Sequence, residues 1–235
     1  NLDYDTKLKS YVKSESFSPL FEYSPPQVLA ALSQGFGEDF IGSHKPMVRC
    51  ETPAELNRPL LPVLAVLTRA IYHNKVVKIQ YRSIQSGLSE REIVPFVLVD
   101  NGLRWHVRAF DRNRQAFIDF VVTRIANPVI VEDSPQDHES SEADIQWNRI
   151  VEMKLVAHPN LPHPETIEMD YAMQDGALKV NVRAAAAGYV LRRWNVDCTE
   201  DHSLEGAEYH LWLKNWQALY GVENLVIAPG YKQAN

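Results

Sequence analysis

The sequence contains little cysteine and no long apolar run. Its two cysteines, Cys50 and Cys198, stand alone, without a CxxC pair or clustered histidines nearby. Neither a zinc site nor a disulfide framework is therefore indicated, and both residues are predicted to be buried thiols. No apolar stretch approaches the roughly 20 residues that a membrane helix needs, and no signal peptide opens the chain. We expect a cytoplasmic protein with no membrane partner.

Recognisable catalytic motifs are also missing. The chain has no GxSxG, HExxH, Walker or GxGxxG motif, and no Cys and His pair that chain order supports. His158 and His163 flank prolines in a loop, at a spacing typical of no known site. We therefore predict that the protein is not an enzyme and uses no cofactor. A hydrolase built from His106 and scattered carboxylates stays open, although no spacing requires it.

Short strand-like runs dominate residues 76–125. β-branched and aromatic residues alternate there with polar ones, and the runs are separated by turn residues at Ser86-Gly87, Asp100-Asn101-Gly102 and Asp111-Arg112-Asn113. Strands with no helix between them predict a strongly bent antiparallel sheet or barrel. Residues 69–124 hold ten Lys or Arg and five Asp or Glu, a net charge of +5 in a chain whose total is −6. A basic segment in an acidic protein indicates an anionic ligand.

Residues 1–73 predict two helices and a hairpin. Two short strands joined by the Asp5-Thr6-Lys7 turn are expected to pair. A short amphipathic helix is predicted from Ser24, its candidate N-cap, to Gly35, and one strand near residues 47–50 lies in the linker that follows. A second helix is predicted over residues 60–73, where leucines recur at helical spacing and the prolines fall in the first turns.

The last hundred residues predict alternating strands and helices. The acidic stretch EDSPQDHESSEAD, after Val131, is typical of a linker between domains. Beyond it we expect strands at residues 150–157, 178–184, 209–213 and 225–228, with helices at 164–173 and 185–194. That alternation fits a small ferredoxin-like sandwich, so the predicted fold class is α+β.

The strand expected at residues 103–110 has two different faces. Alternation puts Leu103, Trp105, Val107 and Ala109 on one face, and Arg104, His106, Arg108 and Phe110 on the other. Trp105 is predicted to lie in the core. Two arginines and a histidine in a row suit a phosphate, because guanidinium groups form bidentate, charge-assisted hydrogen bonds with it. The residues alone nevertheless favour a solvated outer face on a half-buried strand.

The order of several short motifs resembles the WYL domain. A strand ending in Tyr81-Arg82-Ser83 is followed by Ile93-Val94-Pro95, by Trp105-His106-Val107 and by Thr123-Arg124-Ile125. The Trp-Tyr-Leu run that names the family reads Trp105-His106-Val107 here, so an imidazole that titrates near neutral pH replaces a phenol. Two later runs, residues 155–159 and 189–194, resemble the carboxy-terminal extension that follows many WYL domains.

This resemblance implies four segments. Residues 1–57 would be the end of a winged-helix wing with a linker or dimerisation segment, and residues 58–133 a ligand-sensing WYL domain, a small SH3/Sm-like β-barrel preceded by a helix. Residues 134–146 would be a linker, and residues 147–235 the ferredoxin-like carboxy-terminal extension.

The chain is most similar, within this family, to bacterial regulators found beside phage-defence islands of the BREX and CBASS types. Those regulators begin with a winged helix-turn-helix domain, so we expect the DNA-reading helix to lie upstream of residue 1. The resemblance implies a homodimeric transcriptional regulator that binds a DNA operator, represses a phage-defence locus and senses a nucleic-acid or nucleotide effector. The alternative is a non-catalytic dimerisation or protein-interaction module without a small ligand.

WYL domains are thought to bind nucleic acid or a nucleotide on a basic patch. The resemblance places that patch at Ser83, His106, Arg108 and Arg124. Tyr81 would add stacking, although it shares a strand face with two aliphatic residues and is predicted to pack in the core.

Four further arginines have two interpretations each. Arg124 lies among apolar residues, where it needs either an anion or an acid such as Asp111 or Asp119 as a partner. Arg112, in a turn, is expected to be solvated but could extend the patch. Arg192 and Arg193 could close over the ligand from the second domain, and an exposed helix end near the negative pole of the dipole would explain them equally.

Overall fold

The computed structural model describes residues 2–7, 9–14, 16 and 57–232. It contains two compact units, residues 1–54 and 55–235. In the first, strands β1 (Leu2–Asp5) and β2 (Ser10–Lys13) pair antiparallel, which confirms the predicted hairpin. The helix predicted at Ser24 to Gly35 and the strand predicted at 47–50 lie outside the described residues.

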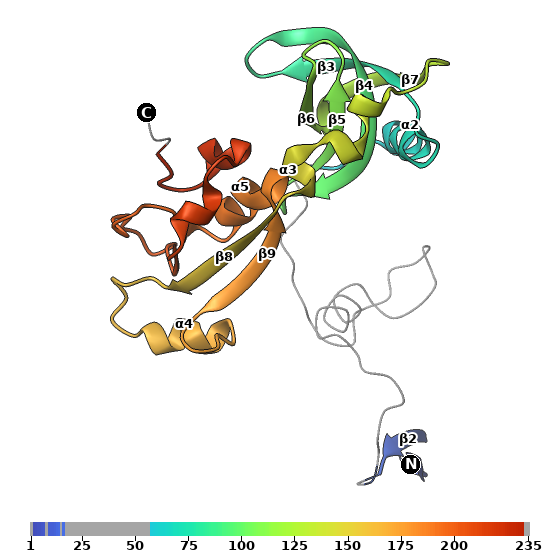
Figure 1. The fold of residues 1–235 in the computed structure, drawn as a ribbon. Helices are drawn as coiled ribbons and strands as arrows, with labels where there is room; N and C mark the ends of the chain where they lie inside the picture. The colour runs from blue at the N-terminus through green and yellow to red at the C-terminus, as the bar shows by residue number, and fades with distance from the viewer. Residues whose placement is uncertain (1, 8, 15, 17–56, 233–235) are drawn as a thin grey trace. The chain divides into compact units, whose positions relative to one another are not determined.

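A helix and a five-stranded antiparallel sheet open the second unit (Figure 1). The helix α2 (Leu61–Tyr72) confirms the prediction for residues 60–73. The strands are β3 (Val77–Ser83), β4 (Gly87–Asp100), β5 (Trp105–Asp111), β6 (Ala116–Val121) and β7 (Ile125–Ile130), with the 3-10 turn η1 (Val122–Arg124) before the last. We call residues 57–130 the five-stranded region.

The strand order in this region is β6-β5-β4-β3-β7. β4 is long and bends at an irregularity between Pro95 and Val97, since proline lacks the N–H that a regular ladder uses. One side of the sheet packs against α2, where Leu67, Ile79 and Phe120 are almost fully buried. The predicted antiparallel sheet is therefore confirmed, whereas an SH3/Sm-like barrel stays a prediction.

Three short helical turns follow the sheet: η2 (Asp137–Glu139), η3 (Ser141–Ala143) and α3 (Ile145–Asn148). The sequence predicted a polar linker here. The structure instead fixes this segment against the five-stranded region through Arg112, whose guanidinium binds both carboxylate oxygens of Glu139 at 2.7 and 2.8 Å and also contacts Asp133.

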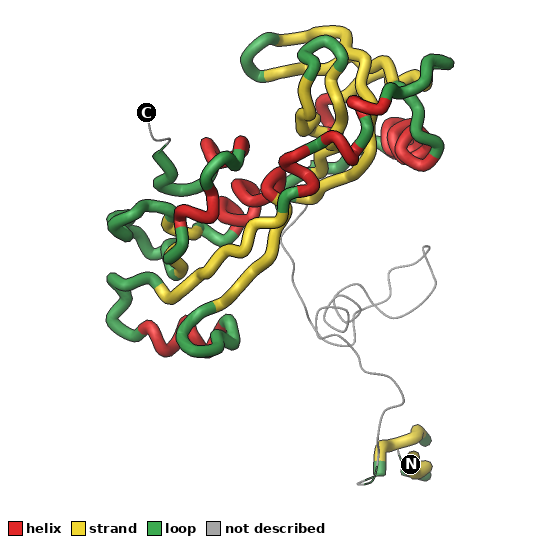
Figure 2. Tube along the Cα trace, in the orientation of Figure 1, coloured by secondary structure: helices red, strands yellow, loops and turns green. Residues whose placement is uncertain are grey.

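A four-stranded sheet forms the rest of the unit (Figure 2). Its elements are β8 (Ile150–Ala157), α4 (Pro164–Asp170), β9 (Leu178–Arg183), α5 (Ala184–Arg193), β10 (Val196–Asp197), β11 (Leu211–Leu213), η4 (Trp216–Leu219) and η5 (Glu223–Ile227). The strand order is β10-β11-β8-β9, and only β10 and β11 run parallel. We call residues 150–232 the four-stranded region.

Two expectations for this region were wrong. A ferredoxin-like chain runs strand-helix-strand-strand-helix-strand, whereas here both helices precede β10 and the last two strands follow without a helix between them. Residues 225–228 were predicted as a strand, but Leu225 lies in η5, packed on α5, because a short apolar run does not distinguish a strand from a buried turn. The α+β fold class itself is confirmed.

Within the described residues, no helix is long and apolar enough to cross a membrane.

Candidate ligand site

Both faces of β5 are buried. Val107 and Ala109 lie in the core beneath α2, as their alternation predicts. On the other face, His106 is 3% and Arg108 5% exposed. The expectation of a solvated outer face was therefore wrong, because α3 and α5 cover these side chains and a strand pattern cannot indicate what a later segment covers.

Arg108 forms buried ion pairs with two acids. Its Nε and Nη2 bind Asp144 at 2.5 and 3.0 Å, and its Nη1 binds Asp119 at 3.0 Å. Burial opposes the charge, but the hydrogen bonds to Asp144 and the charge of Asp119 outweigh it and raise the pKa of Arg108. In this arrangement all three guanidinium nitrogens face carboxylates of the protein.

Tyr189 of α5 connects this ion pair to His106. Its hydroxyl donates to Asp119 Oδ2 at 2.9 Å, while its ring stacks on the imidazole of His106 with centroids 5.0 Å apart. Burial raises the pKa of Tyr189, so the phenol keeps its proton and remains a donor. Burial also lowers the pKa of His106, against the opposing charge of Asp119, and keeps the imidazole neutral.

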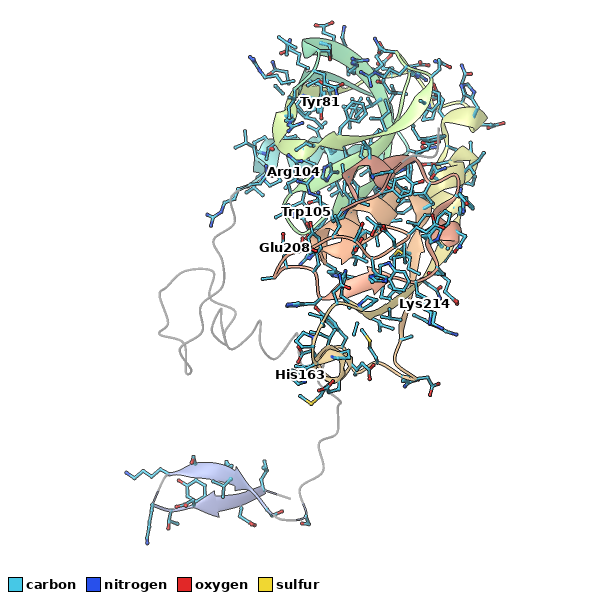
Figure 3. All side chains as sticks on the ribbon, turned by 90° about the vertical axis from the view of Figure 1, so that its left-hand side faces the viewer. Tyr81, Arg104, Trp105, His163, Glu208 and Lys214 are labelled. Carbon is cyan, nitrogen blue, oxygen red and sulfur yellow. The ribbon has the colours of Figure 1, made fainter. Side chains whose placement is uncertain are left out.

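Two polar atoms on this face have no hydrogen bond of good geometry among the described residues, although backbone groups of Arg104 and Val99 lie close to the imidazole of His106. They are Nδ1 of His106 and Nε of Arg104, and both are buried. Buried polar atoms in native proteins nearly always form hydrogen bonds. In Figure 3, Arg104 lies where the five-stranded region meets the four-stranded region. The two atoms indicate a place where a ligand could supply hydrogen-bond acceptors or donors.

A cleft of about 370 Å³ opens between the β4–β5 loop and α5; neither His106 nor Arg104 lines it, but its lining residue Tyr189 stacks on His106. Its lining residues are Val99, Asp100, Asn101, Ala186, Tyr189, Val190, Arg193 and Trp194. The side chain of Arg193 lies directly over Gly102, since a Cβ placed there would be 1.8 Å from its Nη1. Arg192 is exposed and does not line the cleft.

Trp105 was predicted to lie in the core and does not. It is 42% exposed and begins β5 opposite Asp100, next to the β4–β5 loop (Figure 3). The alternation was right from Val107 onward, but a residue at the end of a strand extends past the helix that covers the sheet.

The remaining patch residues lie in the second half of β3 and in η1. Tyr81 packs in the core as predicted, edge-on to Phe120 at 5.0 Å, and its hydroxyl accepts the Val121 N–H at 3.2 Å. The Ser83 hydroxyl accepts the N–H groups of Gln85 and Ser86, so it stabilises the turn after β3.

Arg124 is partly buried and has no ion pair among the described residues. Its two candidate partners are occupied elsewhere, because Asp111 binds Arg91 at 3.3 Å and Asp119 binds Arg108. Neither acid that was considered as an internal partner for Arg124 therefore binds it, and no other ion pair of Arg124 is found among the described residues.

Arg112 was expected to be solvated, and this was also wrong. Its hydrogen bonds to Glu139 and Asp133 raise its pKa and lower the pKa of Glu139, so the turn anchors the segment after the sheet. Arg114, in the same turn, is exposed.

We also searched residues 57–232 and the described part of the amino-terminal hairpin for a metal site and for a reactive thiol. No three His, Cys, Asp or Glu residues gather there as a metal site would require. A cavity of about 650 Å³ lies beside Cys198, Trp216 and Tyr231. Burial raises the pKa of the Cys198 thiol to about 12, which confirms a buried, protonated thiol, while Cys50 lies outside the described residues.

Comparison with known proteins identifies the two regions. A family model of the WYL domain matches residues 62–130, and one described as the BrxR transcriptional regulator, C-terminal dimerization domain, matches residues 150–219. Two DNA-binding transcriptional repressors named CapW are each 32% identical to this chain. The one from Escherichia coli aligns over 94% of this chain and 76% of its own length, and the one from Pseudomonas aeruginosa over 92% and 73%. The chain belongs to the CapW repressor family.

The resemblance to WYL regulators is thereby confirmed. A further CapW repressor, from Stenotrophomonas maltophilia, is 30% identical over 84% of this chain and 68% of its own length. Among solved structures, the proteasome accessory factor PafBC of Arthrobacter aurescens is 18% identical, with 55% of this chain and 22% of that chain covered at a TM-score of 0.33. A score this low carries no argument about the fold. The cleft described above lies where the WYL domain meets the C-terminal dimerization domain.

Sequence reasoning missed the residues that organise this junction. Asp119 was considered only as a partner of Arg124, and its pairing with Arg108 could have been predicted, since the two residues are opposite each other across the turn between β5 and β6. Asp144 and Tyr189 come from later segments and carry no local signal that points to β5. Arg104 was placed on the correct face, but nothing in the sequence indicated that its Nε would lack a partner.

Proposed function

We propose that the protein is a homodimeric, DNA-binding transcriptional repressor of a phage-defence locus, whose WYL domain responds to a nucleic-acid fragment or a nucleotide. The relatives named as DNA-binding repressors support the regulatory part of this proposal, and the match to a dimerization domain supports the homodimer. That kinship supports DNA binding by the full-length protein, whose DNA-reading helix we expect upstream of residue 1, so the DNA-binding test below uses the full-length protein.

The effector part rests on one observation: a cleft between the two domains is lined by Tyr189, which stacks on His106, and the buried Nε of Arg104 and Nδ1 of His106 lack a hydrogen bond of good geometry. Arg104 and Arg193 would bind phosphate oxygens, since guanidinium groups hold phosphates through charge-assisted hydrogen bonds. Trp194, which is 38% exposed at the edge of the cleft, would stack on a base. A ligand with both a phosphate and a base matches this lining better than a simple anion.

The proposed patch still consists of Ser83, His106, Arg108 and Arg124. The expected contribution of its two arginines to phosphate binding now differs. Arg124 has no ion pair among the described residues and is the better phosphate contact, whereas Arg108 is already bound by two carboxylates. Of the second-domain arginines, Arg193 lines the cleft and Arg192 does not.

The effector proposal is tested by fluorescence anisotropy with labelled short single-stranded DNA, single-stranded RNA and cyclic oligonucleotides, at two salt concentrations. We expect binding that weakens with salt, because phosphate contacts release counterions. Arg104→Ala and Arg193→Ala should each weaken it, while Lys214→Ala, an equally basic but exposed position away from the cleft (Figure 3), should not. Failure of every probe to bind at low salt would favour the alternative, an interaction module without a small ligand.

The homodimer and its DNA are tested separately. Light scattering after size-exclusion chromatography should give twice the chain mass. Gel-shift titration of the full-length protein with the promoter region of its own operon should show one complex that competitor DNA of unrelated sequence does not remove. A monomer at micromolar concentration would contradict the dimer, and equal binding of unrelated DNA would contradict a specific operator.

A further inference from the structure

A single side chain belongs both to the cleft and to the buried ion pairs. Tyr189 lines the cleft, stacks on His106 and donates to Asp119. Asp119 uses its two oxygens for different partners, Oδ1 for Arg108 and Oδ2 for Tyr189. A change in the position of the Tyr189 hydroxyl would therefore alter the acid that shares Arg108.

The other acid that holds Arg108 also begins a helix. Asp144 is the N-cap of α3, and its Oδ1 accepts both Arg108 Nη2 and the Trp147 N–H, at 3.0 and 3.1 Å. Trp147 in turn carries the guanidinium of Arg183, at the end of β9, 4.4 Å above its ring. A connected series of contacts thus starts at Tyr189 in the cleft, passes through Asp119 and Arg108 of the WYL domain, and ends at Asp144 and α3.

We propose that Tyr189, which the dimerization domain contributes to the cleft, is the positioning residue that transmits occupancy of the cleft through the WYL residues Asp119 and Arg108 to α3. This inference rests on the proposed function and adds its regulation. A ligand base or phosphate in the cleft contacts the Tyr189 ring and shifts its hydroxyl away from Asp119. Asp119 Oδ2 then turns to Arg108, which moves toward Asp119 and loosens its contact with Asp144. The N-cap of α3 weakens as a result.

The buried charges make this change stepwise rather than gradual. Arg108, Asp119 and Asp144 are almost excluded from water, with side-chain exposures of 6%, 11% and 2%. An unpaired charge at such a position is costly, so Arg108 shifts between the two acids without leaving either one completely. Two discrete arrangements of one network are what a coupling element between two sites requires.

The first test needs no ligand. Tyr189→Phe keeps the ring and removes only the hydroxyl bond to Asp119. We expect the Trp147 amide, whose hydrogen-bond acceptor is Asp144 Oδ1, to exchange with solvent about fivefold faster in this variant, the factor for one hydrogen bond. Tyr81→Phe is the matched control, since it also removes one tyrosine hydroxyl bond, that to the Val121 N–H in the WYL domain, outside the network. Unchanged Trp147 exchange in Tyr189→Phe would overturn the proposal.

The second test adds a 5′-phosphorylated pentanucleotide as the probe. In the unmodified protein, bound probe should speed exchange at α3, whereas in Tyr189→Phe the probe should bind and change that exchange little, because the bond is already absent. Probe that binds the unmodified protein and leaves α3 unchanged would overturn the coupling. If no probe binds, the effector proposal fails, while the ligand-free test still decides whether Tyr189 controls α3.

Discussion

Arg108 shows how a residue chosen as a ligand contact can also be structural. Removing it leaves Asp144 and Asp119 buried without their cation, and breaking a buried pair of this kind costs about 3–5 kcal/mol. We expect Arg108→Ala to lower the free energy of unfolding by an amount in that range, measured by urea denaturation.

The control for this prediction is the exposed pair of Lys78 and Glu90, 3.4 Å apart with both side chains more than half exposed. Glu90→Ala should cost about 0–1 kcal/mol, because solvent screens the attraction. A similarly small loss of unfolding free energy in Arg108→Ala would mean that the buried network is not needed for stability. Arg108 would then be interpreted only as a ligand contact.

His106 should make stability depend on pH. Burial, which outweighs the nearby charge of Asp119, lowers its folded-state pKa below the ordinary value of about 6.5. The unfolded chain therefore takes up the proton first as the pH falls. The contribution of this site is fully present above about pH 6.5 and is lost as the pH falls from there toward the folded-state pKa.

His106→Phe keeps a ring against Tyr189 but cannot take up a proton. When the pH is lowered from 7.5 to 5.5, we expect its unfolding free energy to fall less than that of the unmodified protein. Urea denaturation at both values measures the difference. His163→Phe changes an exposed histidine (Figure 3) and should follow the unmodified protein. Parallel curves for all three proteins would show that His106 does not titrate in this range.

The β4–β5 loop is built around one glycine. Gly102 has φ +81°, which disfavours other residues, and its missing side chain leaves room for Arg193. Gly102→Ala should therefore cost about 1 kcal/mol in backbone strain and also displace Arg193 from the cleft. We expect weaker binding of the labelled oligonucleotide, measured by anisotropy.

Gly87 separates these two effects. It also has a positive φ, of +68°, but an added Cβ would meet nothing within 4 Å. Gly87→Ala should lower the unfolding free energy to a similar extent and leave oligonucleotide binding unchanged. Equal binding by the two variants would show that the position of Arg193 over Gly102 is unimportant for the ligand.

The elements could be predicted where the signal is local. α2 and β8 follow from periodicity, and the turns before β5 and β6 follow from Asn, Asp and Gly. The structure of residues 225–228 could not be predicted, because a run this short is apolar both in a strand and in a buried turn such as η5. The burial of the second face of β5 could not be predicted from the sequence either. It depends on Asp144 and Tyr189, about 40 and 80 residues later in the chain, which only the complete fold brings to β5.

The two domains of the second unit are joined by a short segment that one turn holds in place. Arg112 of the β5–β6 turn binds Glu139 and Asp133, while Arg108 binds Asp144 a few residues further on. A linker restrained at both ends limits how the dimerization domain can move relative to the WYL domain. Loss of the Arg112 contacts should free residues 132–141 without unfolding either sheet, because neither core includes Arg112.

We therefore expect Arg112→Ala to be cleaved several times faster in residues 132–141 by a protease of low specificity, with mass spectrometry locating the cut. Arg114→Ala, the exposed arginine of the same turn, should be cleaved at the rate of the unmodified protein. The far-ultraviolet circular dichroism of both variants should be unchanged. Cleavage of Arg112→Ala inside the sheets would mean that this arginine stabilises the WYL domain itself, whereas cleavage confined to the segment would show that Arg112 sets how firmly a signal in one domain is transmitted to the other.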